Sequence, residues 1–174
     1  MKPNRFLSHL RTIFCALAII GVSLISPTAE AGESPLPASG EFHPCFSIPT
    51  SYRQVGENFI VTFDVTGWID GTLAGSAVGT EMDVVHRDGS INLHGSLVLT
   101  GSVGNNSGTL IFTYEGIGNA VTGHENLHGV GGHGTDGLAG VHVNITLEGD
   151  VGAPNPGCDL SAAGSYTGQI LFAP

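Results

Sequence analysis

Histidines are concentrated in one glycine-rich stretch of this 174-residue chain. Residues His124-Glu125-Asn126-Leu127-His128 match HExxH, in which a helix places two histidines on one face to bind Zn²⁺ and the glutamate acts as a general base. The flanking glycines leave barely two turns for such a helix. The third histidine of the extended motif is out of place, and no methionine follows Met82 to form a Met-turn. The sequence therefore argues against a zinc protease.

The same histidines predict a weaker alternative if the segment is a strand. His124 and His128 would then share a face, with His133 and His142 within reach on a paired neighbour. Neutral imidazoles bind zinc, copper or nickel. One hypothesis is therefore a zinc or copper site on these four histidines, and the alternative is a solvated histidine cluster in a protein without a cofactor.

Two pairs of carboxylates fall on one strand face by the two-residue period. These pairs are Glu81 with Asp83 and Glu148 with Asp150. Charged side chains are seldom fully buried, so we expect both pairs on the solvated outer face. A G-x-S-x-G elbow, a phosphate loop and a dinucleotide fingerprint are all missing from the sequence, which leaves serine and nucleotide chemistry without support.

The first 31 residues are typical of a secretory signal peptide. Lys2, Arg5 and Arg11 precede or flank the apolar run 13–25, and Ala29-Glu30-Ala31 offers small residues for cleavage. The apolar run is too short to span a bilayer comfortably. We therefore expect a secreted or periplasmic protein with no membrane span after cleavage.

Acidic residues dominate the charge of the chain. The net charge is −10, and Arg53 and Arg87 are the only Lys or Arg side chains after residue 31. Nucleic-acid binding needs clustered basic residues, so DNA, RNA and anionic membranes are excluded as expected partners. Cations and neutral molecules remain candidate ligands.

Three cysteines are present, and Cys15 lies in the predicted signal peptide. Cys45 and Cys158 remain near the two ends of the mature chain, in a compartment that permits oxidation. A disulfide between them is expected to stabilise the fold by about 4–5 kcal/mol on the chain-entropy model. The alternative is two free thiols.

Alternating apolar residues predict strands over most of the mature chain. Phe59, Val61, Phe63 and Val65 share one face of a strand that starts at Asn58. The same pattern recurs over residues 81–86, 91–103, 109–114, 141–147 and 166–172. Glycine- and asparagine-rich turns between several of these segments predict antiparallel hairpins, and no segment longer than a turn has a helical pattern.

We expect a flexible leader over residues 32–41 and one domain over residues 42–174. Short, evenly spaced strands with interior glycines, such as Gly71, Gly75 and Gly95, favour an all-β, antiparallel barrel of about eight strands. A β-sandwich is the structural alternative.

Several phrases in the last two-thirds of the chain resemble bacterial allene oxide cyclase-like barrel proteins. These are VVHRDGS, TGSVGNNSGTL, the YEG ending and GGHGTDGLAG, in that order. The resemblance implies a small antiparallel barrel related to plant allene oxide cyclases and dirigent proteins, with an apolar lumen. Related plant barrels assemble as dimers or trimers, so a homo-oligomer is possible.

Three functions follow as hypotheses. A lumen walled by Phe63, Trp68, Phe112 and Tyr114 would bind a small apolar or amphipathic molecule, although the same residues could be ordinary core. The enzymatic form of this hypothesis is a cofactor-free cyclase or isomerase that uses a polar residue such as Glu115, a role suggested by the resemblance. The alternatives are the histidine metal site and a structural envelope or interaction protein with a filled barrel.

Overall fold

The computed structural model describes residues 34–152 and 157–173, so the predicted signal peptide over residues 1–31 lies outside it. The described residues form nine strands and one short 3-10 helix. The elements are β1 (Leu36–Phe46), β2 (Ser51–Val55), β3 (Asn58–Gly71), β4 (Leu73–Val85), β5 (Ser90–Val103), β6 (Asn106–Asn119), β7 (His124–Gly132), η1 (Asp136–Leu138), β8 (Val141–Val151) and β9 (Leu160–Phe172). Nothing helical in this part of the chain is long and apolar enough to cross a membrane.

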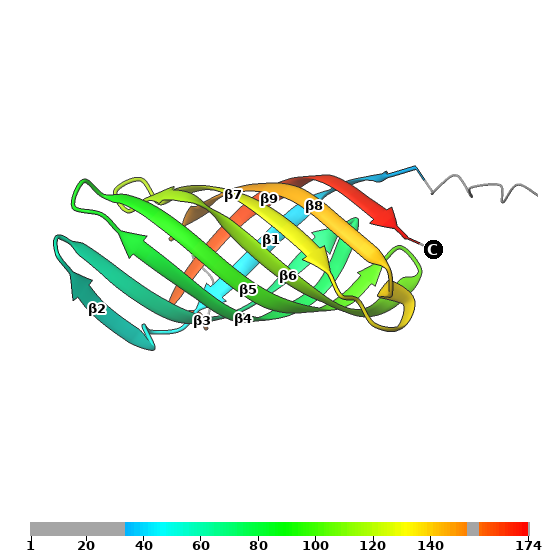
Figure 1. Ribbon diagram of the computed structural model, residues 1–174, viewed down its shortest axis with the longest axis horizontal. Helices are drawn as coiled ribbons and strands as arrows, with labels where there is room; N and C mark the ends of the chain where they lie inside the picture. The colour runs from blue at the N-terminus through cyan, green and yellow to red at the C-terminus, as the bar shows by residue number, and fades with distance from the viewer. Residues whose placement is uncertain (1–33, 153–156, 174) are drawn as a thin grey trace, which may run out of the picture. The chain divides into compact units, whose positions relative to one another are not determined.

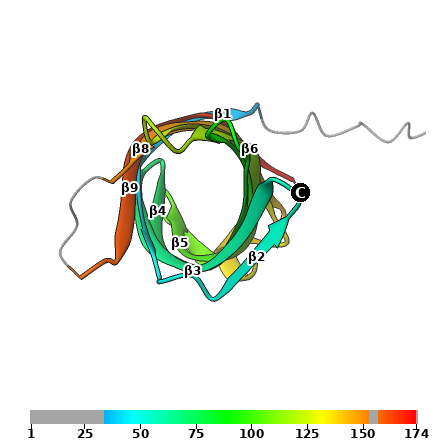
Figure 2. The same cartoon turned by 90° about the vertical axis from the view of Figure 1, so that its left-hand side faces the viewer.

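One antiparallel sheet contains all nine strands, in the order β1-β9-β8-β7-β6-β5-β4-β3-β2. β1 also pairs with the second half of β3, from Gly40 opposite Gly71 to Phe46 opposite Val65. This pairing closes eight strands into a ring, which Figure 2 shows end-on, and leaves β2 as an extra strand on the first half of β3 (Figures 1 and 2). The predicted barrel is therefore confirmed, and the sandwich alternative is wrong.

The first strand of the barrel begins earlier in the chain than the composition of residues 32–41 suggests. Residues 36–41, expected in the flexible leader, form the first part of β1. Their Pro, Ser and Gly content has no apolar period, but Ala38 is buried opposite Gly168 of β9. Pairing with β9 from Leu36, and with β3 as well from Gly40, holds this segment extended, so the boundary expected at residue 42 is wrong.

Apolar side chains fill one end of the lumen. Leu73, Leu110, Val141 and Ile170 are almost completely buried there. Leu138 of η1 is also fully buried and packs into the same cluster, in the loop between β7 and β8 at one end of the barrel in Figure 1. The three-residue helix thus acts as a plug, and the space that could hold a ligand lies further along the axis.

The predicted disulfide is present. Cys45 of β1 is bonded to Cys158, with the two Cα atoms 5.3 Å apart. The bond ties β1 to the segment that enters β9, next to the pairing of Cys45 with Ser161. It therefore reinforces the part of the sheet where the barrel closes.

Tyr166 of β9 ties the closure together from inside. The Leu73 N–H donates to its Oη at 2.8 Å, and the hydroxyl donates to the Asp70 carbonyl at 3.0 Å. A Cβ on Gly40 would lie 2.7 Å from the Tyr166 ring and even closer to the Asp70 carbonyl. Glycine at position 40 is therefore what lets the tyrosine reach the connection between β3 and β4.

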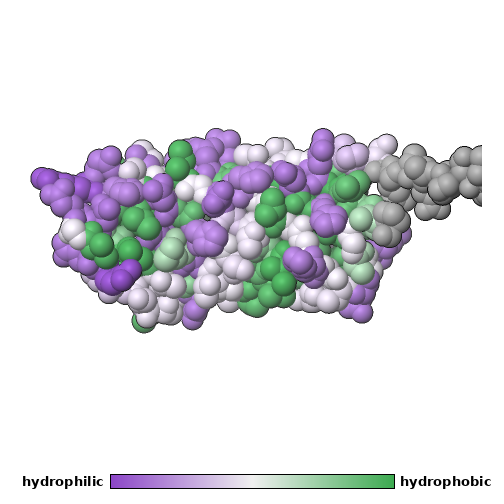
Figure 3. Space-filling view, viewed as in Figure 1, coloured by the Kyte–Doolittle hydropathy of each residue, from purple (hydrophilic) through white to green (hydrophobic). Residues whose placement is uncertain are grey.

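The outer face of the barrel combines polar residues with separate apolar patches (Figure 3). Val78, Val98 and Ile111 are exposed and lie opposite one another on β4, β5 and β6. Sequence alternation places these residues on strands but does not reveal that three strands bring them into one row.

Replacing Tyr166 by phenylalanine tests the closure. Tyr166→Phe keeps the ring but leaves the buried Leu73 N–H without its acceptor, so we expect a loss of about 1–3 kcal/mol in the free energy of unfolding. Urea denaturation measures this loss. Tyr52→Phe on exposed β2 is the matched control and should change stability by less than about 0.5 kcal/mol. Equal stability of the two variants would contradict the role given to Tyr166.

Candidate functional site

A cavity of about 80 Å³ lies in the lumen beside the filled end. Most of its lining is apolar and includes residues of five strands: Phe42, Leu97, Leu99, Phe112, Leu127 and Leu147. A dry apolar cavity of about 150 Å³ is large enough to bind benzene. The space found here suits a smaller molecule, or one end of a longer one.

Two interior glycines position the aromatic walls of this cavity. A Cβ on Gly95 would lie 2.1 Å from Cζ of Tyr114, and one on Gly129 would lie 2.4 Å from Cζ of Phe112. Each ring therefore lies flat across a neighbouring strand, in space that any other residue would occupy. Interior glycines were expected from the sequence, but as sites of bulging and coiling.

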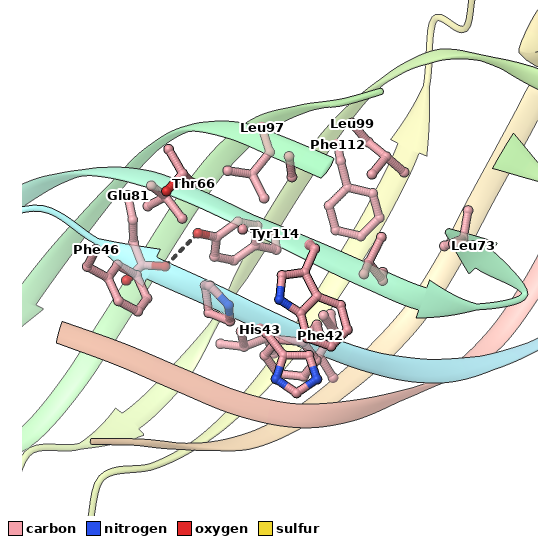
Figure 4. Close-up of a pocket in the computed structure, with 18 of the residues that line it drawn as sticks. Phe42, His43, Phe46, Thr66, Leu73, Glu81, Leu97, Leu99, Phe112 and Tyr114 are labelled. Atoms are coloured by element: carbon pink, nitrogen blue, oxygen red, sulfur yellow. Dashed lines mark hydrogen bonds between the residues drawn. The ribbon is translucent and has the colours of Figure 1, made fainter. Parts of the chain in front are cut away.

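A buried carboxyl group meets the cavity at Glu81 of β4. Only 4 % of its surface is exposed, and the Tyr114 hydroxyl donates a hydrogen bond of 2.6 Å to its Oε2 (Figure 4). Burial, followed by the negative charge of Glu81, raises the pKa of Tyr114, which stays a donor at every ordinary pH. The pair places one acid and one fixed hydrogen-bond donor at the edge of an apolar space.

Asp83 and Glu125 join Glu81 to make a cluster of three carboxyl groups. Burial, and after it the charge of Asp83, raise the pKa of Glu81 from 4.5 to about 8, against the lowering effect of the hydrogen bond from Tyr114. Burial also raises the pKa of Asp83 to about 6 and, together with the Asp83 charge, that of Glu125 to about 7. Among the described residues, Asp83 Oδ1 is buried without a hydrogen-bond partner.

The expectation that Glu81 and Asp83 lie on the outer face is wrong, whereas Glu148 and Asp150 are exposed as expected. Inward positions of β4 include Leu73 and Ala77, but outward ones include Val78 and Met82. Because apolar residues occur at both odd- and even-numbered positions of β4, its sequence does not tell which face of the strand is buried. Only the pairing with β3 and β5 fixes Glu81 inside.

The cavity reaches the wall of the barrel where β1 meets β3. Pro44 lies opposite Gly67 there, and the pairing of β1 with β9 skips both His43 and Pro44. Proline has no N–H for the ladder, and the backbones come so close that a Cβ on Gly67 would lie 2.6 Å from the His43 carbonyl oxygen. Outside this seam the rings of His43 and Trp68 stack, with centroids 3.7 Å apart.

The predicted lumen residues divide between three places. Phe112 and Tyr114 line the cavity from inside. Trp68 lines it at the seam, with 46 % of its surface exposed. Phe63 packs edge-on against Phe46 in a second apolar cluster and is not among the residues that line the cavity.

Glu115 lies on the outer face, between His94 of β5 and His128 of β7. Its side chain therefore points away from the lumen cavity that Tyr114, the preceding residue, helps to line. A catalytic role for Glu115 stays a prediction, and it would require a ligand on the outside of the barrel.

The HExxH segment is a strand, β7, rather than a helix. Its two histidines point outward and Glu125 points inward. Nδ1 of His124 lies 3.0 Å from Asp150 Oδ1, and Nε2 of His128 lies 3.0 Å from Asn144 Oδ1. His133 and His142 are exposed, and no three His, Cys, Asp or Glu side chains within the described ranges are arranged to hold a metal ion. Metal binding by these histidines stays a prediction.

Comparison with known proteins supports the fold. The barrel is similar to the crystal structure of a protein of unknown function from the DUF3224 family of Shewanella oneidensis MR-1, with a TM-score of 0.61 and 16% identity. The similarity covers 81% of this chain and 100% of that one. No family model and no curated protein matches the chain. The barrel implied by the resemblance is thus supported, and the allene oxide cyclase-like family itself is not confirmed.

The buried carboxyls make stability depend on pH. A carboxyl with a raised folded-state pKa contributes stability that is complete below its unfolded pKa, near 4.5 for Glu81, and lost as the pH rises through the folded value of about 8. We therefore expect the free energy of unfolding to fall between pH 5 and 8.5. Glu81→Gln should weaken this slope and exceed the native chain in stability at pH 8.5, by on the order of a few kcal/mol.

Urea unfolding at a series of pH values measures the profile. Glu148→Gln, at an exposed carboxylate, is the control and should keep the native slope. A Glu81→Gln profile parallel to that of the native chain would show that Glu81 ionises normally.

Gly95→Ala should displace Tyr114 and destabilise the barrel by about 1–3 kcal/mol, because the added methyl group overlaps the ring. Gly132→Ala adds a methyl group whose nearest neighbour is 3.8 Å away and serves as the control. Thermal unfolding compares the two. If the overlap is the cause, the combination of Gly95→Ala with Tyr114→Leu costs less than the sum of the single changes.

Proposed function

We propose that this chain is an exported barrel protein that binds a small apolar or amphipathic molecule in its lumen. The observation that carries the proposal is the apolar cavity, bordered by Glu81 and Tyr114, in a barrel whose other end is filled. Small eight-stranded barrels are either filled by side chains or hold one small ligand. A filled structural barrel would not need a space next to a buried acid.

The seam between β1 and β3 is the proposed entrance. Pro44 supplies no N–H there and Gly67 no side chain, and the stacked rings of Trp68 and His43 cover the seam. Side-chain motion of Trp68 and His43 would open a path to the cavity without breaking the backbone pairing between the strands. The disulfide at Cys45 keeps the neighbouring strand in place during such motion.

Export is the other part of the proposal. The disulfide fits an oxidising compartment, and the predicted signal peptide supplies the route. Cleavage after Ala31 predicts a mature chain of residues 32–174, which the intact mass of protein purified from its own host would report directly.

A cofactor-free cyclase or isomerase is the enzymatic form of this proposal. Proton transfer needs an acid whose pKa lies near the working pH, within reach of the reacting molecule. Glu81, with a pKa raised to about 8 and oriented by Tyr114, has these properties, whereas Glu115 lies on the other side of the wall. Glu81 is accordingly the residue we propose for such chemistry.

Filling the cavity tests ligand binding. Ala77 lines the cavity and Val78 is exposed on the opposite face of the same strand. Ala77→Leu should abolish the binding of xenon, followed by NMR, and the retention of any host ligand, followed by native mass spectrometry. Val78→Leu should leave both unchanged, and Trp68→Ala should weaken retention by removing the cover of the seam. Binding that survives Ala77→Leu would place the ligand outside the lumen.

A further inference from the structure

The polar residues that line the cavity are carboxyls and a tyrosine on its inner side, with His43, Thr66 and Trp68 at the seam between β1 and β3. Glu81 and Glu125 line it directly, and the hydroxyl of Tyr114 already donates its hydrogen to Glu81. Asp83 lies two residues beyond Glu81 on the same inward face, with its buried Oδ1 unpartnered among the described residues. A ligand in the cavity thus meets acceptors at one end and hydrocarbon along the rest.

No basic side chain of the described chain neutralises these groups from within the lumen. Arg53 lies on exposed β2, and Arg87 pairs with Glu57 at 2.8 Å, where both are exposed. His124 acts on Glu125 electrostatically, but its ring lies on the outer face between Glu148 and Asp150. His43 lines the cavity only at the seam, where its ring is stacked on Trp68.

We propose that the lumen ligand is a small organic amine, bound with its apolar part in the cavity and its ammonium group beside Glu81 and Glu125. This inference rests on the lumen binding proposed above and names the chemical class of the ligand. An ammonium group has three hydrogens to donate and no acceptor, which complements an edge made of acceptors. A carboxylic acid would add a like charge to the cluster, and an alcohol would donate a single hydrogen bond.

Electrostatics of the chain favours the same class. An ammonium group beside the cluster would offset the repulsion between its carboxylates and stabilise their ionised forms. Binding should therefore release protons from Glu81 and Glu125 at neutral pH. The net charge of −10 also raises the local concentration of cations around the protein.

Three probes of equal length test the inference on the full mature chain. n-Butylamine, 1-butanol and butanoate have chains of the same length and differ in the head group. We expect the amine to bind at least tenfold more tightly than the alcohol, and butanoate not to bind, by titration calorimetry and NMR at pH 7.5. Repeating the amine titration in buffers of different ionisation enthalpy should show proton release. Lengthening the amine should raise affinity about fourfold per methylene until the cavity is full.

Matched variants assign the effect to the lumen. Glu81→Gln and Glu125→Gln keep the side-chain shape, and each should reduce the preference for the amine over the alcohol about tenfold. Glu148→Gln removes an exposed carboxylate and should leave the preference unchanged.

The outcomes separate this inference from the proposed lumen binding. Equal binding of the amine and the alcohol, or tighter binding of butanoate, would overturn the amine assignment while xenon binding still upheld the lumen site. Calcium or zinc binding that is lost in Glu81→Gln would overturn it in favour of a metal ion. Failure of xenon and all three probes to bind the native chain would overturn the lumen site itself.

Discussion

The pairing of β1 with β3 is the constraint on which the rest of the molecule depends. Without it the chain is an open antiparallel sheet, and the inward residues of β4 to β9 have no enclosed space to share. Tyr166 holds the closure from inside through the backbone of Asp70 and Leu73, and the disulfide ties the other end of β1 to the segment that enters β9. Closure also makes the seam, because Pro44 and Gly67 meet where the two ends of the sheet join.

The closed barrel encloses a lumen. The side chains that point into this lumen are unevenly distributed along the barrel axis. One end is packed with aliphatic residues and plugged by Leu138, so water is excluded from that side. Phe112 and Tyr114 lie across glycines in the middle and narrow the lumen without filling it. The carboxyl cluster follows, close enough to the apolar part for burial to be the largest cause of each raised pKa. The chemical character of Glu81 is thus set by the packing of residues far from it in sequence.

The alternation of apolar residues predicted the barrel, and the turn residues predicted its hairpins. The number and positions of the cysteines predicted the disulfide. The inside of the barrel was harder to predict. On β4 both parities carry apolar residues, so Glu81 and Asp83 were placed outside by their charge. Phe112 was predicted in the lumen, but the glycine at position 129 that makes room for its ring lies on another strand. The HExxH motif spans a strand, so its glutamate and its histidines lie on opposite faces of the wall.

Burial of three carboxyl groups opposes the stability of the fold. Each loses hydration, two of them repel a neighbour, and apolar residues of similar size at these positions would remove both costs. A barrel that served only as a scaffold would gain nothing from Glu81, Asp83 and Glu125 in place of the leucines and valines that occupy its other end. Local departures from stable packing are expected where a protein binds or reacts with something else. In this barrel the departure lies at the border of the cavity, where the missing counter-charge is what an incoming cation would supply.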